Sequence, residues 1–326
     1  MMAGLYSTTF TPRERRQALR DGLNSGTIQR LPGAFSPLVG RAIQDAGFEG
    51  VYVSGAVVSA DLALPDIGLT TLTEVAGRAR QIARSTDLPV LVDADTGFGE
   101  PMSAARTVSE LEDAGVAGCH LEDQVNPKRC GHLDGKEVVP TELMLRRITA
   151  AVNERRDDTF IICARTDAAG VEGIDAAIER AKAYADAGAD MIFTEALHTP
   201  ADFEKFRGAV DVPLLANMTE FGKTELLPAD QLQDIGYNAV IYPVTTLRIA
   251  MGQVEHALQD IAVTGTQSGW VDRMQHRSRL YELLRYAEYN AFDQQVFTYS
   301  AENYQSSFTP YATYASDSTD PTHKNS

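Results

Sequence analysis

The chain has 326 residues, 44% of them apolar, and a formal net charge of −16 at pH 7, which fits one large α/β domain and argues against a nucleic-acid partner, because phosphate binding needs a basic surface. Its three cysteines form no Cys-x-x-Cys pair, so neither a disulfide scaffold nor a zinc ribbon is expected. Residues 1–10 lack the pattern of a signal peptide, and no apolar run approaches the roughly 20 residues that span a bilayer, so we expect a cytoplasmic protein without a membrane partner.

Short apolar strands alternate with helical patterns along the chain. In chain order, strands are predicted over residues 28–35, 51–54, 89–93, 118–122, 160–165, 191–195, 213–217 and 239–242, and the helical patterns include residues 103–114, 141–155, 173–187 and 228–235. Parallel strands buried on both faces read as apolar runs. Eight such strands in about 250 residues indicate a (β/α)₈ TIM barrel. An open doubly wound sheet is the alternative, although no Gly-x-Gly-x-x-Gly motif follows the first strand.

The segment after the barrel is predicted to be helical over residues 270–295, where leucines recur at helical spacing beside three tyrosines. We expect this additional helical segment to pack on its own barrel or on a neighbouring subunit. From about residue 300 the composition turns to Ser, Thr, Tyr, Asp and Asn, which is typical of a flexible tail. The expected organisation is one domain over residues 1–297, with terminal helices from about residue 270, and a tail over residues 298–326.

Polar residues stand at or just beyond the ends of seven predicted strands. They are Ser54, Asp93 with Asp95, Glu122, Arg165, Glu195, Asn217 and Arg248. A single Asp at such a position is an ordinary helix N-cap, but the carboxyl ends of barrel strands converge on one mouth. A ring of carboxylates and guanidinium groups therefore indicates an active site there. Asp93 and Asp95 offer the hard oxygen ligands that suit Mg²⁺.

The stretch from Lys128 to His132 places the thiol of Cys130 among two cations and an imidazole, surroundings that stabilise a thiolate. Cys119 and Cys163 lie inside apolar strands, so we interpret them as small core residues. A tuned thiol beside a carboxylate-held metal favours an enzyme that acts on a small, anionic, oxygen-rich substrate.

These motifs resemble the isocitrate lyase and phosphoenolpyruvate mutase superfamily, and most closely its 2-methylisocitrate lyases. The matching segments, within residues 20–297, are 52–55, 64–66, 92–99, 118–124, 128–132, 164–168, 217–222 and 242–243. The resemblance implies cleavage of 2-methylisocitrate, a tricarboxylate, to pyruvate and succinate, as in the methylcitrate cycle of propionate catabolism. It also implies a homotetramer in which subunits exchange the terminal helix.

The resemblance further implies a role for each matching residue. Cys130 would protonate the succinate carbanion, with Lys128, Arg129 and His132 setting its pKa, and Tyr52 is the candidate base. Asp93 and Asp95 would hold Mg²⁺, with Mn²⁺ as a substitute, and Asp66 and Glu122 would face its water shell. The substrate-binding residues would be Ser54, Gly55, Ala56, Cys130, Gly131, Arg165, Glu195, Asn217, Thr219, Arg248 and Arg277.

Two alternative functions remain. One is an isocitrate lyase, which forms glyoxylate and succinate. Arg129 and Phe193 favour the methylated substrate, because isocitrate lyases typically have Lys and Trp there, whereas Ala56 departs from the Gly of the 2-methylisocitrate lyases. The other is a catalytically silent barrel that serves as a binding module, which the joint presence of the metal, thiol and arginine residues argues against.

Overall fold

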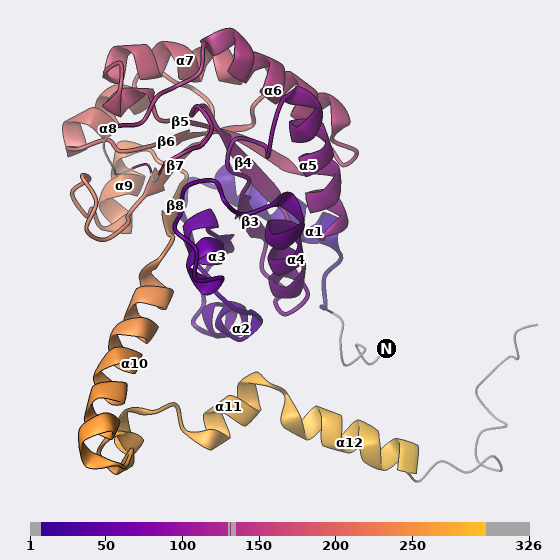
Figure 1. Ribbon diagram of the computed structural model, residues 1–326. Helices are drawn as coiled ribbons and strands as arrows, with labels where there is room; N and C mark the ends of the chain where they lie inside the picture. Colours follow the sequence, from indigo (N-terminus) through magenta and orange to yellow (C-terminus); the bar gives the residue numbers. More distant parts are fainter. Residues whose placement is uncertain (1–7, 130, 132–134, 298–326) are drawn as a thin grey trace, which may run out of the picture. The chain divides into compact units, whose positions relative to one another are not determined.

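The computed structural model describes residues 8–129, 131 and 135–297. In this part of the chain, eight parallel strands form one sheet in the order β1-β8-β7-β6-β5-β4-β3-β2 (Figure 1). The strands are β1 Gln29–Pro32, β2 Val51–Val53, β3 Val90–Asp93, β4 Gly118–Glu122, β5 Ile161–Thr166, β6 Met191–Thr194, β7 Leu214–Asn217 and β8 Ala239–Tyr242. A parallel bridge from Gly33 to Tyr52 joins β1 to β2, and the Ala34 amide donates to the Tyr52 carbonyl at 2.9 Å. The predicted (β/α)₈ barrel is confirmed.

Most helices follow a strand and cover the outside of the barrel, whereas α10 Thr245–Thr264 extends away from it (Figure 1) and buries none of its residues. In the first compact unit, which ends at Gln275, the helices are α1 Pro12–Leu23, α2 Pro37–Asp45, α3 Gly55–Asp61, α4 Leu72–Ala83, α5 Pro101–Asp113, α6 Thr141–Glu154, η1 Ala168–Gly170, α7 Ile174–Asp186, α8 Pro200–Arg207, α9 Ala229–Ile235, α10 Thr245–Thr264 and η2 Ser268–Arg273. Local sequence sets several of their starts. Thr71, for example, caps α4 in a reciprocal capping box with Glu74. No described helix combines the length and apolar character needed to cross a membrane.

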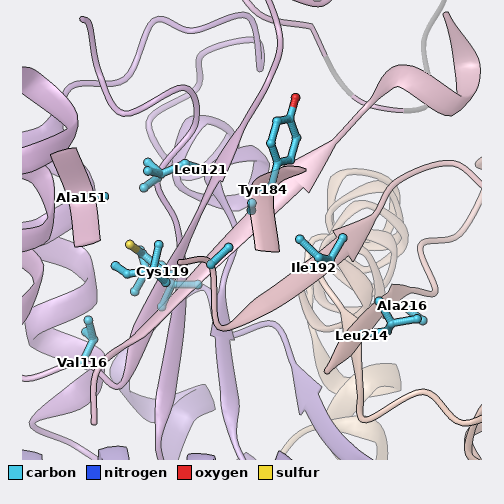
Figure 2. Close-up of a cluster of buried hydrophobic side chains, with 14 of the residues drawn as sticks. Val116, Cys119, Leu121, Ala151, Tyr184, Ile192, Leu214 and Ala216 are labelled. Atoms are coloured by element: carbon cyan, nitrogen blue, oxygen red, sulfur yellow. The ribbon is translucent and has the colours of Figure 1, made fainter. Parts of the chain in front are cut away.

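The alternation of side chains along the strands separates two apolar layers. The outer layer lies between strands and helices, and Figure 2 shows Cys119, Leu121 and Ile192 of the strands in it, near Ala151 and Tyr184 of the helices. The inner layer fills the barrel and consists of Leu19, Leu23, Leu31, Tyr52, Leu91, Ala117, Ile161, Cys163, Met191, Phe193, Leu215, Ala239 and Ile241. Both cysteines predicted to be core residues are buried.

This alternation explains why the polar strand ends meet. Asp93 follows the inner residue Leu91 by two positions, and Arg165 follows Cys163 in the same way. Each therefore belongs to the inward face of its strand, at the carboxyl end. At the opposite end, Leu19 and Leu23 of α1 join the inner layer. The open mouth is therefore the carboxyl end, where the predicted site residues lie.

The segment after the barrel differs from its prediction as one helix over residues 270–295. It comprises η2, α11 Arg277–Leu283 and α12 Tyr286–Phe297. The helical pattern is interrupted because Met274 is extended, with φ −80° and ψ 152°, and because Arg285 adopts a left-handed φ of 57°. Helices α11 and α12 belong to a second compact unit that begins at His276, and the rings of Tyr281 and Tyr286 stack at 4.8 Å. The predicted tail, residues 298–326, lies outside the described residues.

Candidate active site

A cavity of about 90 Å³ lies at the carboxyl ends of the strands. The predicted site residues that line it are Tyr52, Ser54, Ala56, Asp66, Asp93, Lys128, Arg129, Gly131, Arg165, Glu195, Asn217, Thr219 and Arg248, and they are joined by Phe193, Ile241, Pro243 and Val244. The fold thus brings together most residues predicted for the site. Cys130 and His132 lie outside the described residues. Arg277 begins α11 in the second unit, and its contact with substrate stays a prediction.

Asp93 and Asp95 present carboxylates at the end of β3. Asp93 accepts hydrogen bonds from the backbone amides of Gly55 and Asp95, each at 3.0 Å, so it is held rigidly. Asp95 has a left-handed φ of 46°, a conformation that Asp tolerates better than most residues. Its Oδ1 lies 2.9 Å from Lys128 Nζ, which also contacts Asp66. The ammonium of Lys128 therefore sits among the carboxylates expected at the metal site.

The charges of this group are strongly coupled. Burial raises the pKa of Asp95, and the neighbouring Asp93 carboxylate raises it further. Burial also acts to raise the pKa of Asp93, but His120, Lys128 and Arg165 hold it below its usual value. Two neighbouring buried carboxylates can both stay ionised only when cations lie nearby.

This donor set fits Mg²⁺. The carboxylates are hard oxygen ligands, and Oε1 of the buried Glu122 has no hydrogen-bond partner among the described residues. No group of three or more His, Cys, Asp or Glu side chains in the described ranges is arranged to hold an ion. Mg²⁺ usually keeps several waters and takes only one or two carboxylates, so Asp93 and Asp95 are sufficient side-chain ligands for it.

Tyr52, which lines the cavity, forms a buried pair with His120. The Tyr52 hydroxyl lies 2.7 Å from His120 Nε2, and the two rings stack at 5.9 Å. Burial raises the pKa of Tyr52 well above its usual range, as does the charge of Asp93, whereas burial lowers the pKa of His120 to about 4. Both groups are therefore neutral near pH 7, and they share one hydrogen bond.

His120 was not among the residues predicted for the site, since a histidine inside an apolar strand reads as a core residue. Its Nε2 lies 3.7 Å from Asp93 Oδ1, and its Nδ1 is buried without a hydrogen-bond partner in the described part of the chain. The available signal was its spacing. His120 precedes Glu122 by two positions on β4, so both belong to the inward face.

Arg165 is the central cation of the cavity. Its guanidinium binds both oxygens of Asp167, with Nε–Oδ2 at 2.8 Å and Nη2–Oδ1 at 3.1 Å. It also lies 3.3 Å from Glu122 and 3.6 Å from Glu195, and 5.0 Å above the ring of Phe193. Although burial acts to lower the pKa of Arg165, these carboxylates raise it well above its usual value, so the cation is permanent and fixed in orientation.

Gly131 brings the predicted thiol loop to this guanidinium. A Cβ at position 131 would lie 2.3 Å from Arg165 Nη2 and 2.7 Å from the Glu195 carboxyl carbon. Only glycine leaves room for so close an approach. The backbone next to Cys130 in sequence therefore borders the cavity.

The remaining wall is formed by the ends of β7 and β8. Asn217 Nδ2 donates to Glu195 Oε2 at 3.3 Å. Arg248 contacts the carbonyl of Glu220 at 2.5 Å and its carboxylate at 3.2 Å, while its guanidinium lies 5.2 Å above the ring of Phe221. Arg248 is more exposed than Arg165, and it supplies a second cation at the rim.

The fold and the site together define a (β/α)₈-barrel enzyme with a buried carboxylate group and a fixed arginine at its mouth. The model of the phosphoenolpyruvate phosphomutase family matches residues 19–262. A probable 2-methylisocitrate lyase of Corynebacterium glutamicum is 83% identical over 94% of this chain and 100% of its own length. A 2-methylisocitrate lyase of Aeropyrum pernix is 47% identical over 85% of this chain and 90% of its own.

A solved structure shows the same architecture. Phosphonopyruvate hydrolase in complex with oxalate and Mg²⁺ superimposes with a TM-score of 0.80 at 28% identity, over 88% of this chain and 100% of that one. The chain belongs to the phosphoenolpyruvate phosphomutase family. The resemblance to 2-methylisocitrate lyases found in the sequence is confirmed, and the superfamily is magnesium-dependent.

Proposed function

We propose that the protein is a magnesium-dependent lyase that cleaves 2-methylisocitrate to pyruvate and succinate, as the methylcitrate cycle of propionate catabolism requires. The observation that carries this proposal is the cavity itself. Asp93, Lys128 and the fixed guanidinium of Arg165 line it together, and Lys128 in turn contacts Asp95 at 2.9 Å. The chain is also 83% identical to a probable 2-methylisocitrate lyase.

The reaction breaks the bond between the hydroxyl-bearing carbon and its neighbour. A base takes the hydroxyl proton, the oxygen becomes the ketone of pyruvate, and the electron pair of the broken bond stays on the succinate fragment. That carbanion then takes a proton from a general acid. Asp93 and Asp95 would hold Mg²⁺, with Asp66 and Glu122 near its waters, and the bound ion would polarise the hydroxyl and carboxylate oxygens of the substrate.

The other side chains of the site are assigned to substrate binding and to proton abstraction. Arg165 and Arg248 clamp substrate carboxylates, and Ser54, Asn217 and Thr219 supply neutral hydrogen bonds. Gly55, Ala56, Gly131 and Glu195 complete the substrate-binding set. Tyr52 is the assigned base, and because its pKa is raised, it would need a nearby cation to stabilise its phenolate before it could take the hydroxyl proton.

Cys130 is assigned the proton donation to the succinate carbanion. Gly131, its neighbour in sequence, borders Arg165 and Glu195, which supports a donor on this loop. Lys128 and Arg129 line the same cavity, and together with His132 they are assigned the tuning of the thiol pKa.

The test is a steady-state assay with purified protein, in which pyruvate or glyoxylate is measured with 2-methylisocitrate or isocitrate as substrate. We expect a higher kcat/KM for 2-methylisocitrate, by about 10- to 200-fold, since one methyl group in an apolar pocket is worth about 1–3 kcal/mol. A preference for isocitrate would overturn the proposed substrate. Absence of product from either substrate in the presence of Mg²⁺ would favour the silent binding module.

Several finer features remain part of the proposal. They are the use of Mn²⁺ in place of Mg²⁺, the homotetramer, the exchange of the terminal helix with its Arg277, and the location in the cytoplasm. Light scattering on the full chain and on a chain truncated before Trp270 tests the assembly. A tetramer that loses both size and activity on truncation supports the exchange, and a fully active full-length monomer contradicts it.

A further inference from the structure

Asp167 lies directly behind the proposed site and holds two cations at once. It follows β5, and its side chain has no exposed surface. Both of its oxygens accept hydrogen bonds from Arg165, at 2.8 and 3.1 Å. Oδ1 also accepts one from Lys136 Nζ at 2.9 Å. One carboxylate therefore fixes the guanidinium plane of Arg165 and anchors a lysine from the loop that follows β4.

Lys136 connects this carboxylate to the cavity wall. Its side chain is only 5% exposed, and its Nζ donates a second hydrogen bond to the carbonyl of Gly131. Gly131 in turn approaches Arg165 so closely that a Cβ would meet Nη2 at 2.3 Å. The four residues Gly131, Lys136, Asp167 and Arg165 therefore form a closed ring of contacts.

Asp123 keeps Asp167 in place from the other side. The Asp167 amide donates to Asp123 Oδ1 at 2.9 Å, and Oδ2 of Asp123 accepts from the hydroxyls of Thr166 at 2.8 Å and Tyr184 at 2.9 Å. Asp123 is fully buried. In a buried and satisfied network, a shift of one member leaves others unpaired, so Asp167 has one favoured position.

We propose that Lys136 and Asp167 form a positioning pair for the reaction. Asp167 orients Arg165 toward the substrate carboxylate, and Lys136 holds the Gly131 carbonyl in register with that guanidinium. Neither residue is among those that line the cavity, so both act through the residues that they hold. The inference rests on the proposed lyase function, because its readout is turnover. Misplacement of a binding group by about 1 Å can lower turnover about 100-fold.

The experiment compares Lys136→Met, which removes the charge at similar length, with Lys136→Arg, which can still donate to both acceptors. We expect Lys136→Met to lower kcat at least about tenfold while KM changes less than about threefold, because Arg165 keeps its bonds to Asp167. Lys136→Arg should recover part of the loss. Asp167→Asn should raise KM as well, because it weakens the hold on Arg165 itself.

Arg155→Met is the matched control. Arg155 pairs with Asp190 at 2.6 Å and is 16% exposed, so its loss also breaks a largely buried ion pair, but away from the cavity. It should lower the melting temperature without changing kcat. A loss of kcat of about tenfold or more, with KM within about threefold, that Lys136→Arg reduces supports the pair, whereas a smaller or unrescued loss overturns it.

Wild-type pyruvate release tests the proposed function separately. An inactive wild type overturns that function, while an active wild type with an equally active Lys136→Met overturns only the positioning pair. If Lys136→Met does not fold by circular dichroism, Lys136→Gln replaces it under the same criterion.

Discussion

Replacing Gly131 by alanine tests the contact between the thiol loop and the substrate arginine. The added Cβ would lie 2.3 Å from Arg165 Nη2, so the guanidinium has to retreat by about 1 Å to reach ordinary van der Waals contact. It cannot do so freely, since Nη2 is bonded to Asp167 at 3.1 Å and the Arg165 side chain is only 9% exposed. The substitution therefore costs one charge-assisted hydrogen bond or displaces the loop.

The loss of such a bond is worth about 1.5–3 kcal/mol, which corresponds to a factor of about 10 to 150 in kcat/KM. The assay is pyruvate release from 2-methylisocitrate with saturating Mg²⁺. Gly252→Ala is the control, because Gly252 lies in α10, where an added methyl group would meet no neighbouring side chain within 4 Å, and alanine suits a helix better than glycine. If Gly131→Ala retained kcat/KM within threefold of the wild type, the close approach to Arg165 would be wrong.

Three further outcomes are expected. Asp93→Ala should abolish turnover, because Asp95 alone would be left at the end of β3 to hold Mg²⁺. EDTA should likewise abolish turnover of the wild type, and full activity in metal-free buffer would contradict the metal site. Ile192→Ala should lower the free energy of unfolding by about 2–5 kcal/mol in urea titrations, since Ile192 is fully buried and the change leaves a cavity. A loss below about 1 kcal/mol would argue against tight packing of the outer layer. Burial acts to raise the pKa of the Asp157 carboxyl, but hydrogen bonds from Thr159 and Arg16 outweigh burial and lower the pKa to about 2. The ionised Asp157 therefore stabilises the folded protein above the unfolded pKa near 3.9, and this stabilisation is lost as the pH falls through about 2. The difference in unfolding free energy between the wild type and Asp157→Asn should therefore shrink between pH 4 and pH 2, and a constant difference would refute the assignment.

The barrel and most of the cavity follow from local patterns in the sequence. Apolar runs identify buried parallel strands, and alternation along a strand carries Asp93 and Arg165 to the same mouth as Glu122. The sequence alone did not reveal the contact of His120 with Tyr52, because the two residues lie 68 positions apart on different strands. The ring through Lys136 and Asp167 was missed for the same reason, since it depends on the path of the loop after β4.

The segment after the barrel shows a different limit to predicting structure from sequence. Its leucines and tyrosines recur at helical spacing in residues 270–295, yet the chain leaves the helix at Met274 and again at Arg285. Neither residue is a glycine or a proline, the usual sequence signals of a helix end. Periodicity reports which face is apolar, but it does not report a single left-handed residue within the pattern.

The docking of α1 at the closed end of the barrel has a consequence for synthesis of the chain. The carbonyl of Leu23 accepts a hydrogen bond from Asn238 at 2.8 Å, 215 positions later, and Arg20 pairs with Asp190. At about 5–20 residues per second, a ribosome needs roughly 10–40 s to make the intervening chain. For that time the apolar face of Leu19 and Leu23 lacks its final partners. The nascent amino-terminal helix is therefore a natural client for chaperones, and truncated chains that end before β8 should aggregate more readily than the full-length protein.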